Sequence, residues 1–137
     1  MPLLTWDDKF SVDVQSIDKQ HQKLFAMLNE LYDAMTQGKG SQLAPAILER
    51  LIDYTQEHFA AEEALMKQAC YPDFASHKAE HEKLKAEVEK MLKDAEGASG
   101  LSMLSMPLLD FLRNWLRTHI AQRDKGYTCH LRAAGIH

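Results

Sequence analysis

The chain has few cysteines, prolines and glycines, and no long uninterrupted apolar run. Among its 137 residues only 2 are Cys, 4 are Pro and 6 are Gly. Cys70 and Cys129 have neither metal-site nor redox-motif spacing, so we predict two unpaired, partly buried thiols in a reducing compartment. No segment alternates apolar and polar residues between turn residues, which argues against strands and predicts an all-α fold.

A basic surface is missing as well. The 16 Lys and Arg are outnumbered by 20 Asp and Glu, and the net charge of −4 includes no basic stripe, so a nucleic-acid partner is not expected. Residues 1–10 carry acidic side chains and lack the basic and apolar regions of a secretory signal. We therefore expect a cytoplasmic protein that does not associate with membranes.

The composition is that of an ordinary soluble domain. Apolar residues make up 45% and charged residues 26% of the chain, close to the average for globular proteins. A chain of 137 residues can bury one core of normal size but not two. We expect a single domain that covers residues 1–137.

Four amphipathic helices are predicted by apolar residues that recur at intervals of three and four. We expect them over roughly 17–37, 42–69, 74–95 and 105–124. Ser16 is the expected cap of the first helix, residues 97–100 the expected last loop, and Tyr127 to Ala133 a short helical tail. Helices of similar length with short connections favour an up-down-up-down four-helix bundle, here preceded by an extended lead.

Histidine is the residue type that stands out. Five of the seven histidines fall on the inward stripes of the expected helices: His21, His58, His77, His81 and His119. A single histidine in such a stripe is more often a hydrogen-bonded core residue than a ligand. Five buried imidazoles without a common partner would each cost about 1–3 kcal/mol, so a shared metal site is the better interpretation.

The spacing of these residues supports metal binding. Glu62 follows His58 by four residues, and His81 follows His77 by four, so only about 40° separates the side chains of each pair on a helix. Asp124 follows His119 by five residues, or roughly 140° on a regular helix. It can reach the same site only if the helix ends there or widens, as a π-bulge would allow.

The set of ligands restricts the choice of metal. Five imidazoles and two carboxylates are too many for one tetrahedral zinc, and too rich in nitrogen for calcium or magnesium. Two transition metals fit better. If both carboxylates bridge the metals and an oxo or hydroxo group does so too, one position of two octahedra stays open for a small ligand.

These motifs resemble the hemerythrin family, in particular its single-domain bacterial branch, the bacteriohemerythrins. The matching residues run through nearly the whole chain: Trp6-Asp7, Ile17-Asp18-Lys19-Gln20-His21, His58-Phe59, Glu62-Glu63, Met66, Tyr71-Pro72, His77, His81, Trp115-Leu116, His119-Ile120, Asp124 and Tyr127. Myohemerythrin, another member of that family, is a well-known four-helix bundle. Cys70 stands where the family often has Gly, a change that we expect to be harmless.

The resemblance implies a role for each site residue. One iron would be held by His77, His81 and His119, and the other by His21 and His58. Glu62 and Asp124 would bridge them together with an oxo or hydroxo group, and the open position would lie on the iron with two histidines. The family's apolar oxygen pocket corresponds to Leu24, Phe59, Trp115, Leu116 and Ile120, for which plain core packing is the alternative interpretation.

The function that the resemblance implies is reversible dioxygen binding for storage, delivery or sensing. We expect a monomer that is not an enzyme, whose partners are dioxygen and an oxygen-consuming enzyme. Oxidase or peroxidase side activity is compatible with this role. The first alternative is a di-iron enzyme that reduces peroxide or nitric oxide. The second is a module that senses oxygen, redox state or iron. The third is a structural zinc bundle, which would need fewer than seven ligands.

Overall fold

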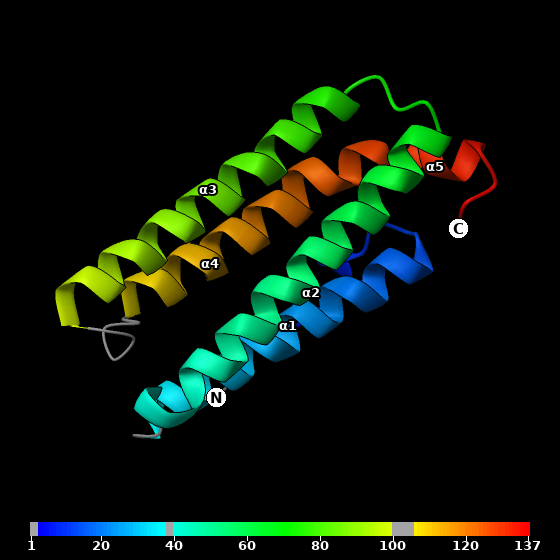
Figure 1. Ribbon diagram of the computed structural model, residues 1–137. Helices are drawn as coiled ribbons and strands as arrows, with labels where there is room; N and C mark the ends of the chain where they lie inside the picture. Colours follow the sequence, from blue (N-terminus) through cyan, green and yellow to red (C-terminus); the bar gives the residue numbers. More distant parts are fainter. Residues whose placement is uncertain (1–2, 38–39, 100–105) are drawn as a thin grey trace.

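A computed structural model of the chain describes residues 3–37, 40–99 and 106–137, and all regular structure within these ranges is helical. The four long helices are α1 (Gln15–Thr36), α2 (Gly40–Gln68), α3 (Phe74–Ser99) and α4 (Met106–Thr118). They run alternately up and down, with α1 beside α2 and α3 beside α4 (Figure 1). The predicted all-α class and four-helix bundle are confirmed.

The fourth helix does not continue regularly to residue 124. After α4 comes a π-helical turn, η3 (His119–Arg123), then a 3-10 turn, η4 (Asp124–Tyr127), and a short helix, α5 (Thr128–Ala133). The expected start of this helix at residue 105 lies outside the described residues. The change of helix type after His119 is the feature of this segment that matters most for the site.

Two predicted helix ends are wrong. The expected loop at 97–100 is helical as far as Ser99, with residue 100 outside the described part. A glycine inside a helix costs only about 1 kcal/mol relative to alanine, so Gly97 does not end α3. The second wrong end is the start of the first helix. There, α1 begins at Gln15 with Val14 as its cap residue, and no side chain caps it.

The extended lead is fixed to the bundle by side chains rather than by a cap at Ser16. The Asp18 carboxylate accepts hydrogen bonds from the backbone N–H of Val12 at 2.8 Å and from the hydroxyl of Ser11 at 2.6 Å. The hydroxyl of Thr128, at the start of α5, donates to the carbonyl of Val12 at 2.8 Å. The lead and the tail are thereby held at the same end of the bundle.

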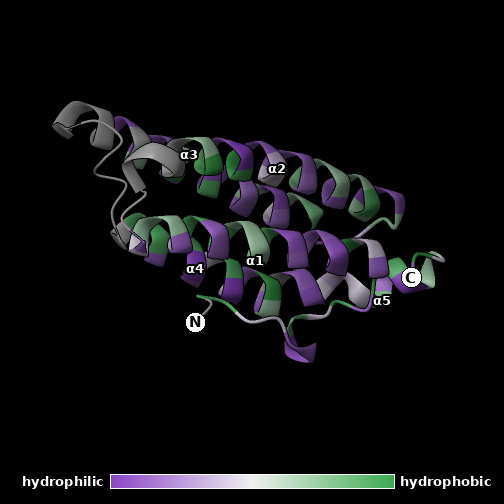
Figure 2. Cartoon of the chain, turned by 90° about the horizontal axis from the view of Figure 1, so that it is seen from below, coloured by the Kyte–Doolittle hydropathy of each residue, from purple (hydrophilic) through white to green (hydrophobic). Residues whose placement is uncertain are grey.

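The apolar core falls into clusters on either side of the buried histidines. The larger cluster occupies the end where α1 finishes and includes Leu28, Leu31, Leu48 and Leu109. A second cluster at the other end consists of Val12, Val14, Ile17, Met66, Tyr127 and Leu131. Hydrophilic and hydrophobic residues are both present along each long helix (Figure 2). Among the described residues, no helix is long and apolar enough to cross a membrane.

The cysteines differ from expectation in one respect. Both are unpaired, as predicted, but Cys70 and Cys129 are exposed rather than partly buried. Cys70 follows the end of α2 with φ 56°, in the left-handed region that favours glycine. The backbone N–H of Tyr71 donates to the carbonyl of Met66 at 3.0 Å, which closes the helix end in the usual way and directs the Cys70 side chain to solvent.

Candidate metal centre

Seven polar side chains are buried together in the middle of the bundle. His21 comes from α1, the pair His58 and Glu62 from α2, and the pair His77 and His81 from α3. The last two are His119, which starts η3, and Asp124, which starts η4. Their exposed fractions lie between 0% and 5%. The structure therefore brings all seven candidate ligands together.

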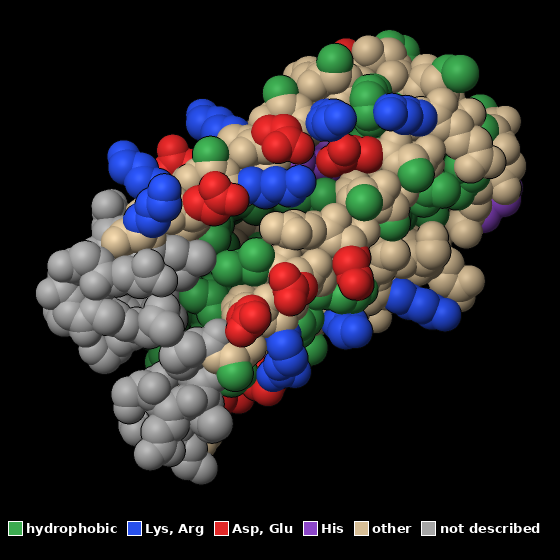
Figure 3. All heavy atoms as spheres, viewed as in Figure 1, with side chains coloured by type: hydrophobic (Ala, Val, Ile, Leu, Met, Phe, Trp, Pro, Cys, Tyr) green, Lys and Arg blue, Asp and Glu red, His purple; other side chains and the backbone are tan. Residues whose placement is uncertain are grey.

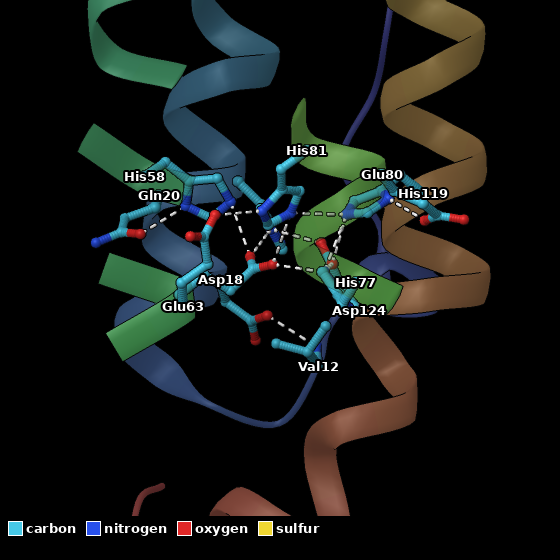
Figure 4. A network of polar contacts seen from close by, with 12 residues as sticks. Val12, Asp18, Gln20, His58, Glu63, His77, Glu80, His81, His119 and Asp124 are labelled. Atoms are coloured by element: carbon cyan, nitrogen blue, oxygen red, sulfur yellow. Dashed lines mark hydrogen bonds and ion pairs between the residues drawn. The ribbon is translucent and has the colours of Figure 1, made fainter. Parts of the chain in front are cut away.

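The ligand atoms form two overlapping groups. Figure 4 shows five of the candidate ligands converging: His58, His77, His81, His119 and Asp124. Within each group the atoms lie within 4.8 Å of one another: one group is Glu62, His77, His81, His119 and Asp124, the other His21, His58, Glu62 and Asp124. The two carboxylates belong to both groups. This is the division into three and two histidines that the hemerythrin resemblance implies for two irons.

The π-helical turn brings Asp124 into the site. The backbone N–H of Asp124 donates to the carbonyl of His119, five residues earlier, so this turn holds one residue more than an α-helical turn. As a result, Oδ1 of Asp124 lies 2.9 Å from Nε2 of His119. Of the two ways in which Asp124 could reach the site, the structure has the widened turn.

The five imidazoles direct their Nε2 atoms at the two carboxylates. The Glu62 oxygens lie 2.9 Å from Nε2 of His77 and 3.0 Å from Nε2 of His58. The Asp124 oxygens lie 2.9 Å from Nε2 of His77 and 3.1 Å from Nε2 of His21. The Nε2 atoms of His119 and His77 are themselves only 3.1 Å apart. Several nitrogen and oxygen donors therefore converge on a small central volume.

Hydrogen bonds within the protein do not satisfy this cluster. Four buried atoms that face the interior of the cluster have no hydrogen-bond partner of good geometry, although oppositely charged groups are near: Nε2 of His21, Oε2 of Glu62 and both Asp124 oxygens. Buried polar atoms without partners are costly and rare. A cation accepts lone pairs from all of them at once, so this donor set fits a two-metal centre.

Protons hold the metal-free cluster together. Burial lowers the pKa of His21 and His77, but the close, negatively charged carboxylates of Asp124 and Glu62 outweigh it and raise each pKa to about 9. Burial raises the pKa of Glu62, but the charge of His58 and hydrogen bonds from the histidines hold it well below its ordinary value. Metal binding must therefore displace protons from the imidazoles.

A cavity of about 40 Å³ adjoins the cluster. It offers room for only a few small molecules. Its lining includes the five predicted pocket residues Leu24, Phe59, Trp115, Leu116 and Ile120, as well as His21, His58, His119 and Asp124. Both histidines of the two-histidine group thus face this cavity. Sequence analysis did not identify five further lining residues: Leu28, Leu51, Thr55, Leu84 and Leu112.

A second cavity, of about 100 Å³, lies next to the first. Leu51, Thr55, Leu84 and Leu112 line both cavities, and the second is also lined by charged side chains of α3. Hydrophobic side chains are visible in the hollow between α2 and α3, surrounded by interspersed charges (Figure 3). Apolar surface therefore continues from the site toward the outside of the bundle.

Sequence analysis also assigned no role to three residues that contact the outward Nδ1 atoms of the histidines. The oxygen of the Gln20 amide lies 2.6 Å from Nδ1 of His58. The carboxylates of Glu63 and Glu80 lie 2.9 Å and 3.2 Å from the Nδ1 atoms of His81 and His119, respectively. Gln20 and Glu63 stand directly beside candidate ligands in the sequence and belong to the motifs shared with the hemerythrin family, and these signals could have pointed to them.

The two remaining histidines lie away from the cluster. His130 and His137 are both exposed, as expected. The His130 ring packs against Tyr71, with 5.1 Å between the ring centroids. Neither belongs to the two groups of possible metal ligands.

The chain is similar to known proteins over most of its length. The family model of the Hemerythrin HHE cation binding domain matches residues 12–131. The bacteriohemerythrin of Methylococcus capsulatus is 38% identical over 128 residues, which is 93% of this chain and 95% of that protein. The bacteriohemerythrin of Pseudomonas aeruginosa is 35% identical over 127 residues, 93% of this chain and 80% of that protein.

Solved structures are similar too. The crystal structure of wild-type hemerythrin has a TM-score of 0.85 and 36% sequence identity, and the match covers 94% of this chain and 98% of that one. A leucine-to-alanine mutant of hemerythrin has a TM-score of 0.86 and 36% identity over 96% of this chain and 98% of that one.

Proposed function

This chain belongs to the hemerythrin family, and we propose that it holds two iron ions in the buried cluster and binds dioxygen reversibly. The relationship to bacteriohemerythrins and hemerythrins supports a di-iron protein that binds oxygen. The observation that carries the proposal is the pair of overlapping ligand groups, because they share both carboxylates and leave buried donors without protein partners. Nitrogen-rich sites with carboxylates suit iron better than calcium or magnesium.

The two groups suggest which residues would hold each ion. His77, His81 and His119 would bind one iron, and His21 and His58 the other. Glu62 and Asp124 would bind both, with an oxo or hydroxo group completing the bridge. A ferrous pair held by these residues would supply the electrons for reversible dioxygen binding. The smaller group offers one histidine fewer, and both of its histidines line the cavity, so a small ligand would reach the iron held there.

The cavity lining favours oxygen binding over oxygen consumption. Apart from the candidate ligands, the one hydroxyl in the lining belongs to Thr55, which donates to the carbonyl of Leu51 at 2.7 Å. Reduction of peroxide or nitric oxide consumes protons, and this lining, as far as the structure describes it, offers no acidic side chain other than Asp124. Leu24, Leu116 and Ile120 add apolar surface to the same lining. We therefore propose a binding protein rather than an enzyme.

We also propose that the protein acts as a monomer in the cytoplasm and delivers oxygen to an oxygen-consuming enzyme. The two exposed, unpaired thiols of Cys70 and Cys129 fit a reducing compartment. Sedimentation of the iron-loaded protein tests whether it is a monomer. Capture of an oxidase only in the oxygenated state would support delivery.

An anaerobic optical titration tests the proposed function. The protein, loaded with iron without oxygen, should contain about two irons per chain and gain charge-transfer absorption when oxygen is added. Degassing should reverse the spectrum, because binding without consumption leaves the oxygen intact. One zinc per chain and no iron-dependent spectrum would show that the proposal is wrong. Steady turnover of peroxide with a reductant would instead favour an enzyme.

A further inference from the structure

The outward nitrogens of the candidate ligands have negatively charged partners on one side of the site. Nδ1 of His81 lies 2.9 Å from Oε2 of Glu63, and Nδ1 of His119 lies 3.2 Å from Oε2 of Glu80. Both histidines belong to the three-histidine group. Figure 4 shows both carboxylates beside rings whose opposite nitrogens point into the cluster. Two of the three imidazoles on this side thus have a carboxylate behind them.

On the two-histidine side, the corresponding atoms have no carboxylate partner among the residues that the structure describes. Nδ1 of His58 lies 2.6 Å from the amide oxygen of Gln20, which carries no charge. Nδ1 of His21 is buried and has no hydrogen-bond partner among the residues that the structure describes. The two sides of the site therefore differ in charge as well as in their number of histidines.

The rings with carboxylate partners are also fixed in orientation. His81 stacks on Phe59 with ring centroids 3.7 Å apart and planes at 3°. His119 stacks on Trp115 at 4.3 Å and 13°. Stacking of this kind prevents the rings from turning away from their partners. In both rings, the orientation that keeps Nδ1 next to its carboxylate therefore also directs Nε2 into the cluster.

A carboxylate partner changes how strongly an imidazole binds a metal. A histidine that gives Nε2 to a metal carries its proton on Nδ1 and donates it outward. A carboxylate acceptor draws that proton away, makes the ring a stronger donor and adds negative charge near the metal. Both effects stabilise ferric more than ferrous iron. A neutral amide orients the ring but adds no charge.

We propose that Glu63 and Glu80 are positioning residues that make the three-histidine iron the more easily oxidised of the pair. This inference rests on the proposed function, because it needs a di-iron centre. In a one-electron oxidation of the ferrous pair by ferricyanide, the electron passes to ferricyanide, which becomes ferrocyanide, and the ferric charge stays on the side of His77, His81 and His119. The iron that faces the cavity stays ferrous.

The two carboxylates should contribute unequally. The Glu63 side chain is 15% exposed, whereas that of Glu80 is 39% exposed. Water screens the more exposed charge. The Glu63 contact is also shorter. Glu63 should therefore have the larger influence on the iron.

Three substitutions test the proposal on the full, iron-loaded chain. Glu63→Gln and Glu80→Gln keep an oxygen acceptor of the same shape but remove the charge. Gln20→Glu adds a charge on the opposite side and is the matched control. Spectroelectrochemical titration measures the first reduction potential, and Mössbauer spectra of the one-electron-oxidised protein show whether the ferric charge is localised. Calorimetry with cobalt(II) measures metal affinity without redox chemistry.

The expected effects differ in sign. Glu63→Gln should raise the potential by about 60 mV, a tenfold change in a one-electron equilibrium, and Glu80→Gln should raise it less. Loss of either partner should weaken metal binding, by about 10-fold or more for Glu63. Gln20→Glu should lower the potential and make the ferric charge less localised. A purely structural disturbance would not shift the potential in opposite directions for substitutions on the three-histidine side and on the two-histidine side.

Failure of the inference is distinguishable from failure of the proposed function. If the parent chain takes up no iron pair, the proposed function is wrong. If the parent binds iron and oxygen but both glutamate variants keep the parent potential, the inference is wrong. The same conclusion follows if Gln20→Glu shifts the potential in the same direction as Glu63→Gln. If Glu63→Gln does not fold, Glu80→Gln, at the more exposed position, is the test. A rise in its reduction potential supports the inference, and an unchanged or lower potential contradicts it.

Discussion

One apolar end of the bundle and its middle are stabilised in different ways. At the apolar end, Leu28, Leu31, Leu48 and Leu109 are almost fully buried, and each such side chain contributes about 1.5–3 kcal/mol by leaving water. In the middle and toward the other end, seven titratable side chains are equally buried. Burying them costs free energy unless a proton or a cation compensates.

Within this one small domain, the residues that stabilise the fold are therefore largely different from the residues that bind metal. The apolar end gains its stability from the chain alone, so its contribution should not depend on metal or pH. The ligand cluster gains its stability from whatever occupies it, because metal binds the folded state and not the unfolded one. A protein built in this way can fold before it is loaded and become more stable once it is.

The largest expected effect is loss of a ligand. His81→Ala or His77→Ala should abolish stable binding of the iron pair and remove the difference in melting temperature between the iron-loaded and metal-free protein. Iron content and thermal melts with and without chelator measure both effects. Equal iron content in these variants and in His137→Ala, which changes an exposed tail residue, would show that the ligand assignment is wrong.

Leu31→Ala is the matched control from the apolar end. Leu31 is 2% exposed and lines neither cavity next to the site. Its replacement should cost about 2–5 kcal/mol in both the metal-free and the loaded protein, with iron content unchanged. If Leu31→Ala also lost iron, the apolar end and the ligand cluster would not be energetically separate.

The next effect is the pH dependence of the metal-free protein. Because the pKa of His21 and of His77 is raised to about 9 from 6.5, their protonated forms stabilise the fold fully below pH 6.5. That contribution should be lost as the pH rises through about 9. The pKa of Glu62 is lowered, so its contribution should instead be lost in acid, below its ordinary value of 4.5.

Urea denaturation with chelator at a series of pH values measures this dependence. The free energy of unfolding should fall between neutral pH and pH about 9, and Leu31→Ala should show a parallel curve at lower stability. A flat profile in the metal-free protein would mean that the imidazoles are not protonated in the cluster. Iron-loaded protein should show a weaker fall, because the metal replaces the protons.

The smallest effect should come from the wall of the cavity. Leu116 is partly buried and lines the cavity together with His21 and His58. Leu116→Ala should keep both irons and still bind oxygen, but autoxidise several times faster and admit azide faster, because water and anions reach the site. Stopped-flow autoxidation measured beside a thermal melt tests this. A variant that melts lower but autoxidises at the parent rate would show that Leu116 is core packing only.

The presence of the helices could be predicted from the sequence more accurately than the residues at which they begin and end. Apolar periodicity is spread over many residues, so the all-α class does not depend on any one of them. Helix ends depend on a few local contacts. At the start of α1, the Asp18 side chain bonds to the lead and no cap is used at Ser16. At the end of α3, Gly97 continues the helix instead of stopping it.

The candidate ligands could be predicted because their spacing is local. His58 with Glu62 and His77 with His81 are pairs on one helix, and their direction follows from helix geometry. The outer partners could not be predicted in this way. Gln20 and His58 are 38 residues apart, and their contact depends on how α1 packs against α2. The same is true of Thr55 and Leu84, which reach the cavity from facing helices.

The π-helical turn has a consequence for the length of the chain. The other two ligand pairs are spaced by four residues, so the turn from His119 to Asp124 is equivalent to the same arrangement with one residue inserted. The insertion is absorbed within one turn, and residues beyond it, such as Tyr127, keep an inward direction. Ala121 and Gln122 within the turn are exposed. Deleting one of them would restore an ordinary α-helical turn with Asp124 still on the ligand face, so a change of one residue in length at this turn need not cost a ligand.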